Sequence, residues 1–240
     1  MINFFRKIRE KLLSEGKTGK YLKYAIGEIV LVVIGILIAL QINNWNESRK
    51  EHQLETKILK EILLNLETDL KNLDISITSI NNEWMRNNTK VLEHLNNDMP
   101  ITDSLRYYYS RLYGHVDFQP NTIGYDNLKS VGIDIIQNEQ LRKEIAELYS
   151  IKYFLFVEVR RTNVRKFQDF QIEELYANIR TIKPLEIGEP INLKELRQNI
   201  RFKNTLLGNI FILEWVNSQY IQGKEDIELV AQSIRNELNK

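Results

Sequence analysis

The sequence predicts an all-α protein in which one N-terminal transmembrane helix continues into an extracytoplasmic antiparallel helical bundle. Three observations carry this prediction. Residues 25–42 form an apolar run, residues 47–97 contain neither proline nor glycine, and the four prolines all fall between segments of helical periodicity. With 240 residues, the chain has room for one domain with its own core after the apolar run.

The apolar run has the length of a membrane-spanning helix. Its eighteen residues include one charge, Glu28, and at about 1.5 Å per residue they span about 27 Å, close to the hydrocarbon thickness of a bilayer. A cleavable signal peptide or a buried core helix fits less well, because the run is long and ends without a small-x-small cleavage site. Aromatic residues suited to the membrane interfaces flank it, namely Tyr21, Tyr24 and Trp45. We therefore expect an uncleaved signal-anchor helix over residues 24–45.

The charges around this helix predict its orientation. Residues 1–23 hold seven Lys or Arg and two Glu, and an excess of cationic residues stays on the cytoplasmic side of a membrane. We therefore expect a short basic cytoplasmic segment at 1–23 and a periplasmic domain at 46–240, in a single-pass protein of the cytoplasmic (inner) membrane. After Lys23 the chain carries 26 basic and 30 acidic residues. Such a domain lacks the basic surface that nucleic acid requires, so we expect no nucleic-acid partner.

Glu28 is a candidate membrane-embedded acid. A carboxylate in hydrocarbon costs about 2.5 to 3.5 kcal/mol at mid-bilayer, so such residues are candidates for proton or ion handling. Glu28 lies about one turn inside the cytoplasmic boundary, where its head can reach water. We therefore favour an interfacial acid, or one that pairs within an oligomer, over a proton carrier. Small side chains at Gly27, Gly35 and Ala39 are candidates for packing against another membrane helix.

The apolar positions after residue 47 recur mostly in steps of three and four. They are Leu59, Leu63, Leu66, Leu70, Leu73, Ile77, Ile80, Trp84 and Val91. This seam predicts a long helix that packs lengthwise, either on other helices of a bundle or on a second copy in a dimeric coiled coil. We favour the bundle, because further amphipathic helices follow, and we keep self-association through this helix as the alternative.

The rest of the chain is predicted to be helical with short connections. The expected helices cover about 102–115, 122–131 before Gly132, a long segment from the N-cap Asn138 to about 179, and a last segment from about Asn192. Residues 206–216 are apolar on nearly all sides, so we expect them to be the deeply buried turn of the bundle. No pair of strands joined by a hairpin turn is predicted.

The sequence contains no recognisable catalytic or metal-binding pattern. It has no cysteine, its three histidines lack metal-ligand spacing, and no nucleophile elbow, phosphate loop or dinucleotide fingerprint is present. We expect no catalytic, cofactor-binding or metal-binding residues and no enzyme activity. A lipid or cell-wall enzyme would instead need a deep polar cleft with converging carboxylates.

A run of tyrosines and arginines is the candidate partner-binding patch. It consists of Arg106, Tyr107, Tyr108, Tyr109, Arg111, Tyr113 and Tyr125. Tyr and Arg are enriched where proteins bind partners. The alternative is that these residues fill half-buried positions between helix and loop, because a ring with a polar tip suits such places.

Two blocks of sequence resemble a known family. Residues 4–9, 24–29 and 41–46 are similar to the opening of an uncharacterised family of bacterial single-pass membrane proteins, whose domain has no known function. Residues 125–132 and 136–142 are similar to that family's second block. The resemblance implies a small anchored protein with an exported helical domain. It implies no activity, substrate or site residues.

These observations favour a function in binding. We expect a membrane-anchored extracytoplasmic scaffold or sensor-like module without catalytic activity, whose partners are the lipid bilayer and a protein. The alternative is an ion- or proton-coupled accessory subunit of a membrane complex, which would use Glu28.

Overall fold

The computed structural model describes residues 18–113 and 118–240, and almost all of them are helical. The predicted all-α class is therefore confirmed. The chain divides into two compact units, Met1–Leu54 and Glu55–Lys240. Each unit is described by itself.

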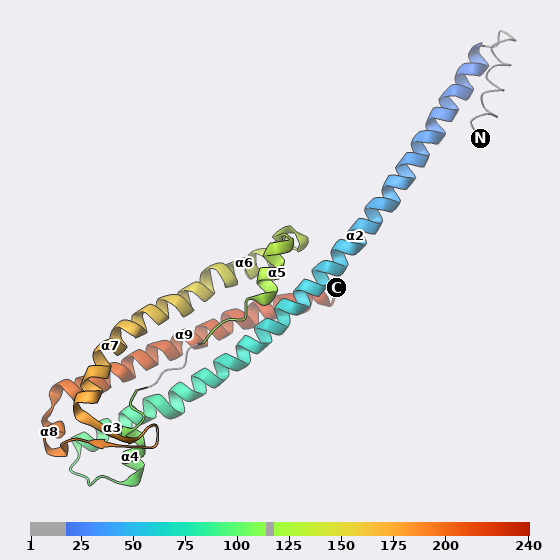
Figure 1. Cartoon of the computed structure of the whole chain (residues 1–240). Coiled ribbons are helices and arrows are strands. Elements are labelled where there is room, and N and C mark those ends of the chain that lie inside the picture. Colours follow the sequence, from blue (N-terminus) through green and yellow to red (C-terminus); the bar gives the residue numbers. More distant parts are fainter. Residues whose placement is uncertain (1–17, 114–117) are drawn as a thin grey trace. The chain divides into compact units, whose positions relative to one another are not determined.

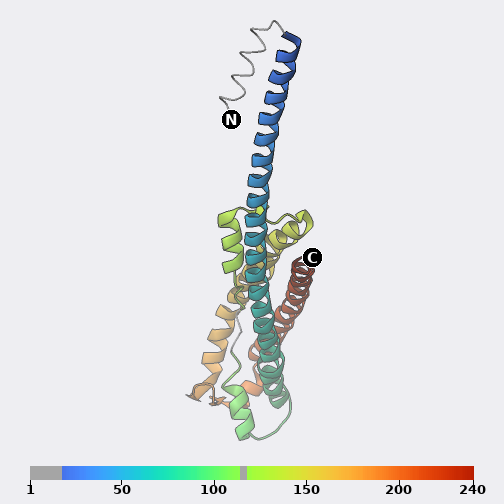
Figure 2. The same cartoon turned by 90° about the vertical axis from the view of Figure 1, so that its right-hand side faces the viewer.

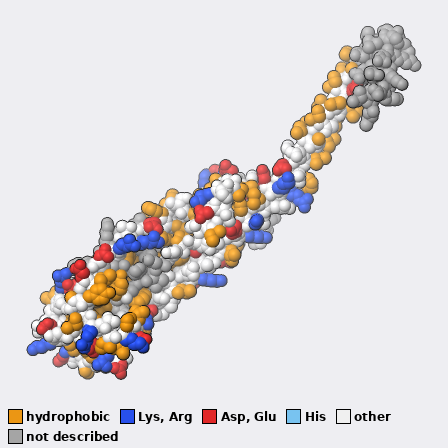
Figure 3. Space-filling view, in the orientation of Figure 1, with side chains coloured by type: hydrophobic (Ala, Val, Ile, Leu, Met, Phe, Trp, Pro, Cys, Tyr) orange, Lys and Arg blue, Asp and Glu red, His pale blue; other side chains and the backbone are white. Residues whose placement is uncertain are grey.

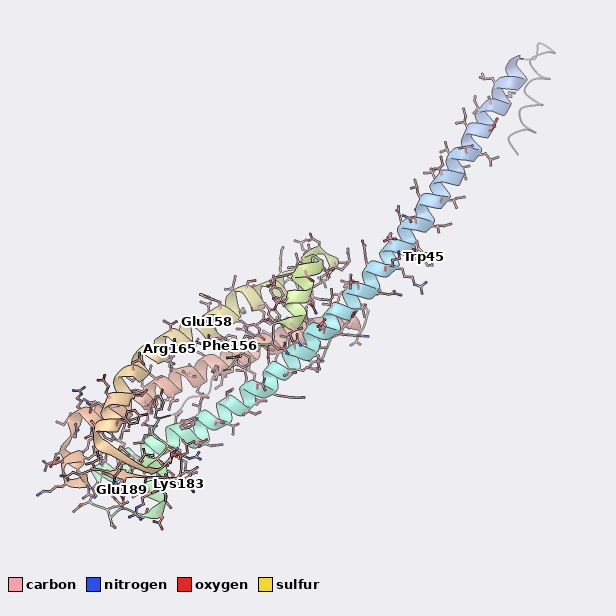
Figure 4. The ribbon with its side chains drawn as sticks, in the orientation of Figure 1. Trp45, Phe156, Glu158, Arg165, Lys183 and Glu189 are labelled. Carbon is pink, nitrogen blue, oxygen red and sulfur yellow. The ribbon has the colours of Figure 1, made fainter. Side chains whose placement is uncertain are left out.

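The first unit is built on the beginning of α2 (Thr18–Ser79). Among the described residues, this is the one helix long and apolar enough to cross a membrane, with a mean hydropathy of 2.6 over its most apolar window. None of that window is buried within the chain, and apolar side chains cover it in Figure 3. Trp45, which follows the apolar run, is also exposed (Figure 4). Lipid would satisfy this surface better than water.

The second unit is a helical bundle in which the later part of α2, the segment from α6 to α7, and α9 run side by side and contact one another (Figures 1 and 2). After α2 the elements are the π-helix η1 (Ile80–Met85), α3 (Arg86–Asn96), α4 (Asp103–Tyr109), α5 (Ile123–Val131), the 3-10 helix η2 (Ile133–Ile135), α6 (Glu139–Glu147), the π-helices η3 (Leu148–Lys152) and η4 (Phe154–Val159), α7 (Arg160–Asn178), β1 (Ile179–Lys183), β2 (Ile187–Pro190), α8 (Leu193–Gln198) and α9 (Ile200–Leu238). Helices α4 and α8 and the two strands lie at one end of the bundle, and α5 lies at the other.

The predicted seam faces the core. Leu59, Leu66, Leu73 and Ile80 are almost completely buried, and the seam residues between them are half-buried. Helix α9 contributes the opposing apolar side chains, which are Phe202, Leu206, Leu213, Val216, Tyr220, Ile227 and Ile234. Each buried side chain of this size stabilises the fold by about 1.5 to 3 kcal/mol relative to leaving it exposed. The lengthwise packing in a bundle is confirmed, and self-association through the long helix stays a prediction.

Helix α5 packs very closely on α2. A Cβ atom added at Gly124 would lie 2.9 Å from the backbone nitrogen of Ile62, so only glycine fits there without displacing backbone. The Gly124 N–H donates a hydrogen bond to Oδ1 of Asn65 over 2.8 Å. The predicted end of this helix is also confirmed, because Gly132 follows it with φ +114°.

The helix predicted to open at Asn138 contains two π-helical segments. Asn138 caps α6 by accepting a hydrogen bond from the Leu141 N–H over 3.2 Å, as predicted. The π-helices η3 and η4 then follow before α7. Together with Tyr153 between them, they bring aromatic rings into a cluster with rings from three other segments; the cluster comprises Phe118, Tyr125, Tyr149, Tyr153, Phe156 and Tyr220. Phe156 lies against α9, where an added Cβ at Gly223 would be 3.0 Å from its ring (Figure 4).

The expectation that no hairpin occurs was wrong. Strands β1 and β2 pair in antiparallel register, with Ile179 opposite Pro190. The connecting turn contains Leu185 at φ +59° in place of the Asn-Gly or Asp-Gly pair that marks a hairpin in sequence, so the usual signal was absent. An added Cβ at Gly188 would lie 2.8 Å from the Ser110 nitrogen. The backbone of β2 therefore lies directly against the end of α4, with no room for a side chain at residue 188.

Other element boundaries also differ from prediction. The segment 206–216 is not buried throughout, because Leu207 is 51% exposed and Phe211 is 67% exposed. Helix α9 presents only one stripe of side chains to the bundle, so an apolar residue on its far side stays at the surface. The last helix is also interrupted at Asn199, which caps α9, and α4 ends at Tyr109 rather than at residue 115. Residues 114–117 lie outside the described part of the chain.

Candidate binding groove

A groove of about 630 Å³ opens where η1 and α3 meet α4. Its volume is within the range of small-ligand sites. The lining residues are Asn82, Glu83, Arg86 and Asn87 from η1 and α3, and Asp103, Ser104, Tyr107, Tyr108 and Arg111 from α4 and the residues after it. The groove is therefore mainly polar and contains both charges.

Buried amides hold the two walls of this groove together. The side-chain amide of Asn88 donates to the Leu112 carbonyl over 3.2 Å, and the amide of Asn209 on α9 donates to the same carbonyl over 3.0 Å. The amide of Asn87 lies 3.4 Å from the Arg111 carbonyl. These contacts fix the end of α4 against α3, because buried backbone carbonyls need donors.

Arg111 makes three kinds of contact within the protein. Its guanidinium lies 4.6 Å from the centre of the Tyr107 ring, which is a cation–π contact. It also forms an ion pair with Glu83, and its Nε donates to the Leu185 carbonyl of the hairpin turn over 2.8 Å. Arg111 therefore joins η1, α4 and the hairpin.

Arg86 has a different environment. Its guanidinium lies 5.8 Å from the centre of the Tyr108 ring, and Nη2 donates to the Tyr108 hydroxyl over 3.3 Å. Within the described part of the chain, no carboxylate forms an ion pair with it. A guanidinium has five N–H donors, so most of the donors of this exposed side chain face solvent.

The structure divides the predicted Tyr/Arg patch. Tyr107, Tyr108 and Arg111 line the groove together. Arg106 lies beside them and is paired with Asp103 at 3.1 Å and with Glu189 of β2 at 3.7 Å. Figure 4 shows Glu189 at this end of the bundle.

The other three residues of the patch lie elsewhere. Tyr109 is buried, and its hydroxyl lies 2.9 Å from Nδ1 of His94 in the core. Tyr113 is exposed and does not line the groove. Tyr125 belongs to α5 at the other end of the bundle, where its ring stacks on Tyr149 with centroids 4.5 Å apart.

The sequence-based reasoning missed the residues that α3 and η1 contribute to the groove. The signal was the polar gap that interrupts the apolar seam at Asn87, which is buried and holds the Arg111 carbonyl. Polar residues inside an otherwise apolar seam mark positions with a specific partner. Glu83 and Arg86 come just before Asn87 in the sequence.

The candidate residues of the membrane segment lie on α2 in the first unit. Glu28 is half-exposed, and Ala39 is exposed. A Cβ atom added at Gly27 or Gly35 would meet nothing within 4 Å. These small residues therefore have open space around them, and the predicted packing against another membrane helix stays a prediction.

A second group of polar side chains on α2 has a structural role. The Asp69 carboxylate is completely buried and accepts hydrogen bonds from the Tyr153 hydroxyl over 2.7 Å and from the Asn121 N–H over 3.0 Å. Burial raises the pKa of the Asp69 carboxyl to about 6, although both hydrogen bonds act to lower it. Glu55 similarly accepts from the Gln137 N–H over 2.9 Å. These carboxylates hold the chain around α5 onto α2.

Among residues 18–113 and 118–240, no group of three His, Asp or Glu side chains is placed to hold a metal ion. The carboxylates that line the groove, Glu83 and Asp103, are each paired with an arginine. The groove therefore offers charged and hydrogen-bonding contacts to a ligand.

The fold and the groove define a helical-bundle protein whose described residues include one helix long and apolar enough to cross a membrane. A family model described as a family of unknown function (DUF6090) matches residues 28–173. This match covers more than half of the chain, so the chain belongs to that family, and the predicted resemblance is confirmed. The matched part begins at Glu28 and includes every residue that lines the groove. No curated protein and no solved structure matches the chain.

Proposed function

We propose that this protein is a membrane-anchored binding module whose extracytoplasmic helical bundle holds a partner protein at the groove lined by Tyr107, Tyr108, Arg86 and Arg111. The apolar run of α2 serves as a signal anchor in the inner membrane, with the N-terminus in the cytoplasm and the bundle in the periplasm. The excess of cationic residues before the run supports this orientation.

One observation carries the proposal. Three of the seven residues that the sequence marks as a partner-binding patch come together in one groove, and a fourth, Arg106, lies beside it. Tyrosine and arginine are the residue types that contribute most often to binding hot spots, because each combines a large contact area with hydrogen-bonding groups. The tyrosine rings are held in place by cation–π contacts, which lowers the entropy lost when a partner binds.

Site-specific photo-crosslinking in native membranes tests the proposal. Replacing Tyr107, whose side chain is 40% exposed, by the photoreactive p-benzoylphenylalanine keeps an aromatic ring in the groove. We expect the full-length protein to form one defined adduct with a partner protein after irradiation. The matched control carries the same replacement at Tyr176, which is 74% exposed on α7 and outside the groove.

The comparison of the two positions distinguishes specific binding of a partner protein at the groove from nonspecific contact of the exposed surface with other proteins. An adduct that forms at residue 107 and not at residue 176 supports the proposal. Equal adducts at both positions, or no adduct at residue 107, contradict it. A reporter enzyme that works only in the periplasm, fused after Lys240, tests the orientation separately, and activity confined to the cytosol contradicts the proposed topology.

A further inference from the structure

The arginines at the groove differ in whether a carboxylate pairs with them. Arg111 is paired with Glu83, and Arg106 is paired with Asp103 and Glu189. Arg86 has the Tyr108 ring and hydroxyl as its contacts and forms no carboxylate pair within the described residues. The planar guanidinium therefore presents unused N–H donors at the groove, in the geometry that a carboxylate accepts in a bidentate contact.

We propose that the groove binds an acidic segment of the partner protein and that a carboxylate of that segment pairs with Arg86. This inference rests on the proposed function and names the chemistry of the partner. The exposed edge of the Tyr107 ring lies in the same groove and gives an apolar contact for the residue beside that carboxylate.

The other charges of the groove select the kind of anion. Glu83 and Asp103 also line it and are paired with Arg111 and Arg106, so the groove has no excess of positive charge for a doubly charged group. A phosphate, with a charge close to −2, is therefore disfavoured relative to a carboxylate. The groove lining holds both acidic and basic side chains, and the face of the bundle seen in Figure 3 mixes them too, so the inference rests on Arg86 and not on a broad basic surface.

The shape of the groove favours a protein segment over a free small molecule. Sites for small ligands bury most of the ligand surface, whereas this groove is open and its lining is mainly polar. A segment that is held by the rest of its own protein loses less entropy on binding here than a free carboxylate does. A segment of a few residues fits the volume of about 630 Å³.

The test measures the photo-adduct at residue 107 in the full-length protein in native membranes. Proteolysis and mass spectrometry of the adduct identify the partner segment, and we expect it to contain Asp or Glu within a few residues of the attachment point. The change Arg86→Gln should lower the adduct yield about tenfold, the typical effect of losing a hydrogen bond between charged groups. Arg165→Gln is the matched control, because Arg165 is an exposed arginine on α7 (Figure 4), and its yield should stay unchanged.

Charge reversal provides the decisive comparison. Arg86→Glu should abolish the adduct, and a Lys in place of the partner's Asp or Glu should restore it. An unchanged yield with Arg86→Gln, or an attached segment without a carboxylate, overturns the inference while the adduct itself still supports the proposed function. If no adduct forms at residue 107 in the unsubstituted background, the proposed function and this inference both fail.

Discussion

The hydroxyl of Tyr109 donates a hydrogen bond to Nδ1 of His94 across 2.9 Å inside the core. The direction follows from the other ring nitrogen, since Nε2 lies 2.9 Å from the Met99 carbonyl, which can only accept. Burial lowers the pKa of His94, so the neutral ring fits this arrangement. Both nitrogens of the buried histidine are therefore satisfied by partners on the α3–α4 connection and on α4.

Removing the Tyr109 hydroxyl should destabilise the bundle. The change Tyr109→Phe leaves Nδ1 of His94 without its donor in a fully buried position, and an unsatisfied buried acceptor costs about 1 to 3 kcal/mol. Urea unfolding of the full-length protein in mild detergent measures the loss. The matched control is Tyr107→Phe on the same helix, which should change the free energy of unfolding by less than about 0.5 kcal/mol, because that side chain is partly exposed. Equal losses in both variants would show that the contact with His94 contributes nothing specific.

Gly124 should not tolerate even a methyl group. In an ordinary helix, a change from Gly to Ala gains up to about 1 kcal/mol. At this position the new Cβ would lie 2.9 Å from the Ile62 nitrogen, so α5 must move away from α2. We expect Gly124→Ala to lower the free energy of unfolding by about 1 to 3 kcal/mol.

Gly35→Ala is the steric control for that variant, because an added Cβ there meets nothing within 4 Å. It should leave the unfolding of the bundle unchanged in the same urea titration. A stabilised Gly124→Ala variant would contradict the close approach of α5 to α2.

Asp69 should make the stability of the bundle depend on pH. Its pKa is raised from 3.8 to about 6 in the folded state, so the folded protein binds more protons than the unfolded chain between these values. The stabilising contribution is complete below the ordinary pKa and is lost as the pH rises through about 6. Relative to Asp69→Asn, the wild-type protein should lose stability on the order of 1 kcal/mol between about pH 5 and about pH 7.5.

The Asp69→Asn variant keeps an oxygen that can accept from the Asn121 N–H, so it should fold. Thermal unfolding at several pH values measures the difference, and Asp74→Asn, an exposed position on the same helix, is the control that should follow the wild type. A wild-type curve that runs parallel to that of Asp69→Asn over this range would contradict the assignment.

Glu28 distinguishes the binding module from the coupled subunit. The change Glu28→Gln removes the one charge of the apolar run, which lowers the cost of inserting the helix. If the protein works by binding, the photo-adduct at residue 107 and growth of a strain that depends on the protein should both be unchanged. Glu47→Gln, outside the apolar run, is the control. Loss of growth with Glu28→Gln alone, while the adduct persists, would favour the proton- or ion-coupled role.

The parts of the fold that follow from periodicity and capping could be predicted. The seam from Leu59 to Ile80, the stop at Gly132 and the cap at Asn138 each express a local rule of helix formation. The hairpin could not be predicted, because its turn carries Leu185 at positive φ and its strands are stabilised by contact with α4. The exposure of Phe211 on α9 could not be predicted either, because the sequence does not show which face of that helix a neighbouring helix covers.

The groove could be predicted only on the α4 side. Tyr107, Tyr108 and Arg111 lie within a span of five residues, so the sequence alone marks them as part of a patch. Arg86 and Glu83 precede it by some twenty residues, and they reach it through the packing of α3 on α4. Tyr109 was assigned to the patch because it is a tyrosine next to Tyr107 and Tyr108. Each residue along a helix is turned by about 100° from the one before it, and this turn places the Tyr109 side chain in the core.

The π-helix η1 determines which side chains face the groove. A wide turn of this kind holds one residue more than an α-helical turn of the same rise. Because the wide turn already holds that extra residue, deleting one residue between positions 80 and 85 would let the backbone close into an ordinary α-helical turn while α3 keeps its direction relative to α2. The same deletion in an α-helical stretch of α2 would rotate everything beyond it by about 100°, and Asn87 and Asn88 would leave the carbonyls of Arg111 and Leu112. The protein should therefore tolerate a one-residue deletion within η1 better than one in the preceding α-helical turns of α2.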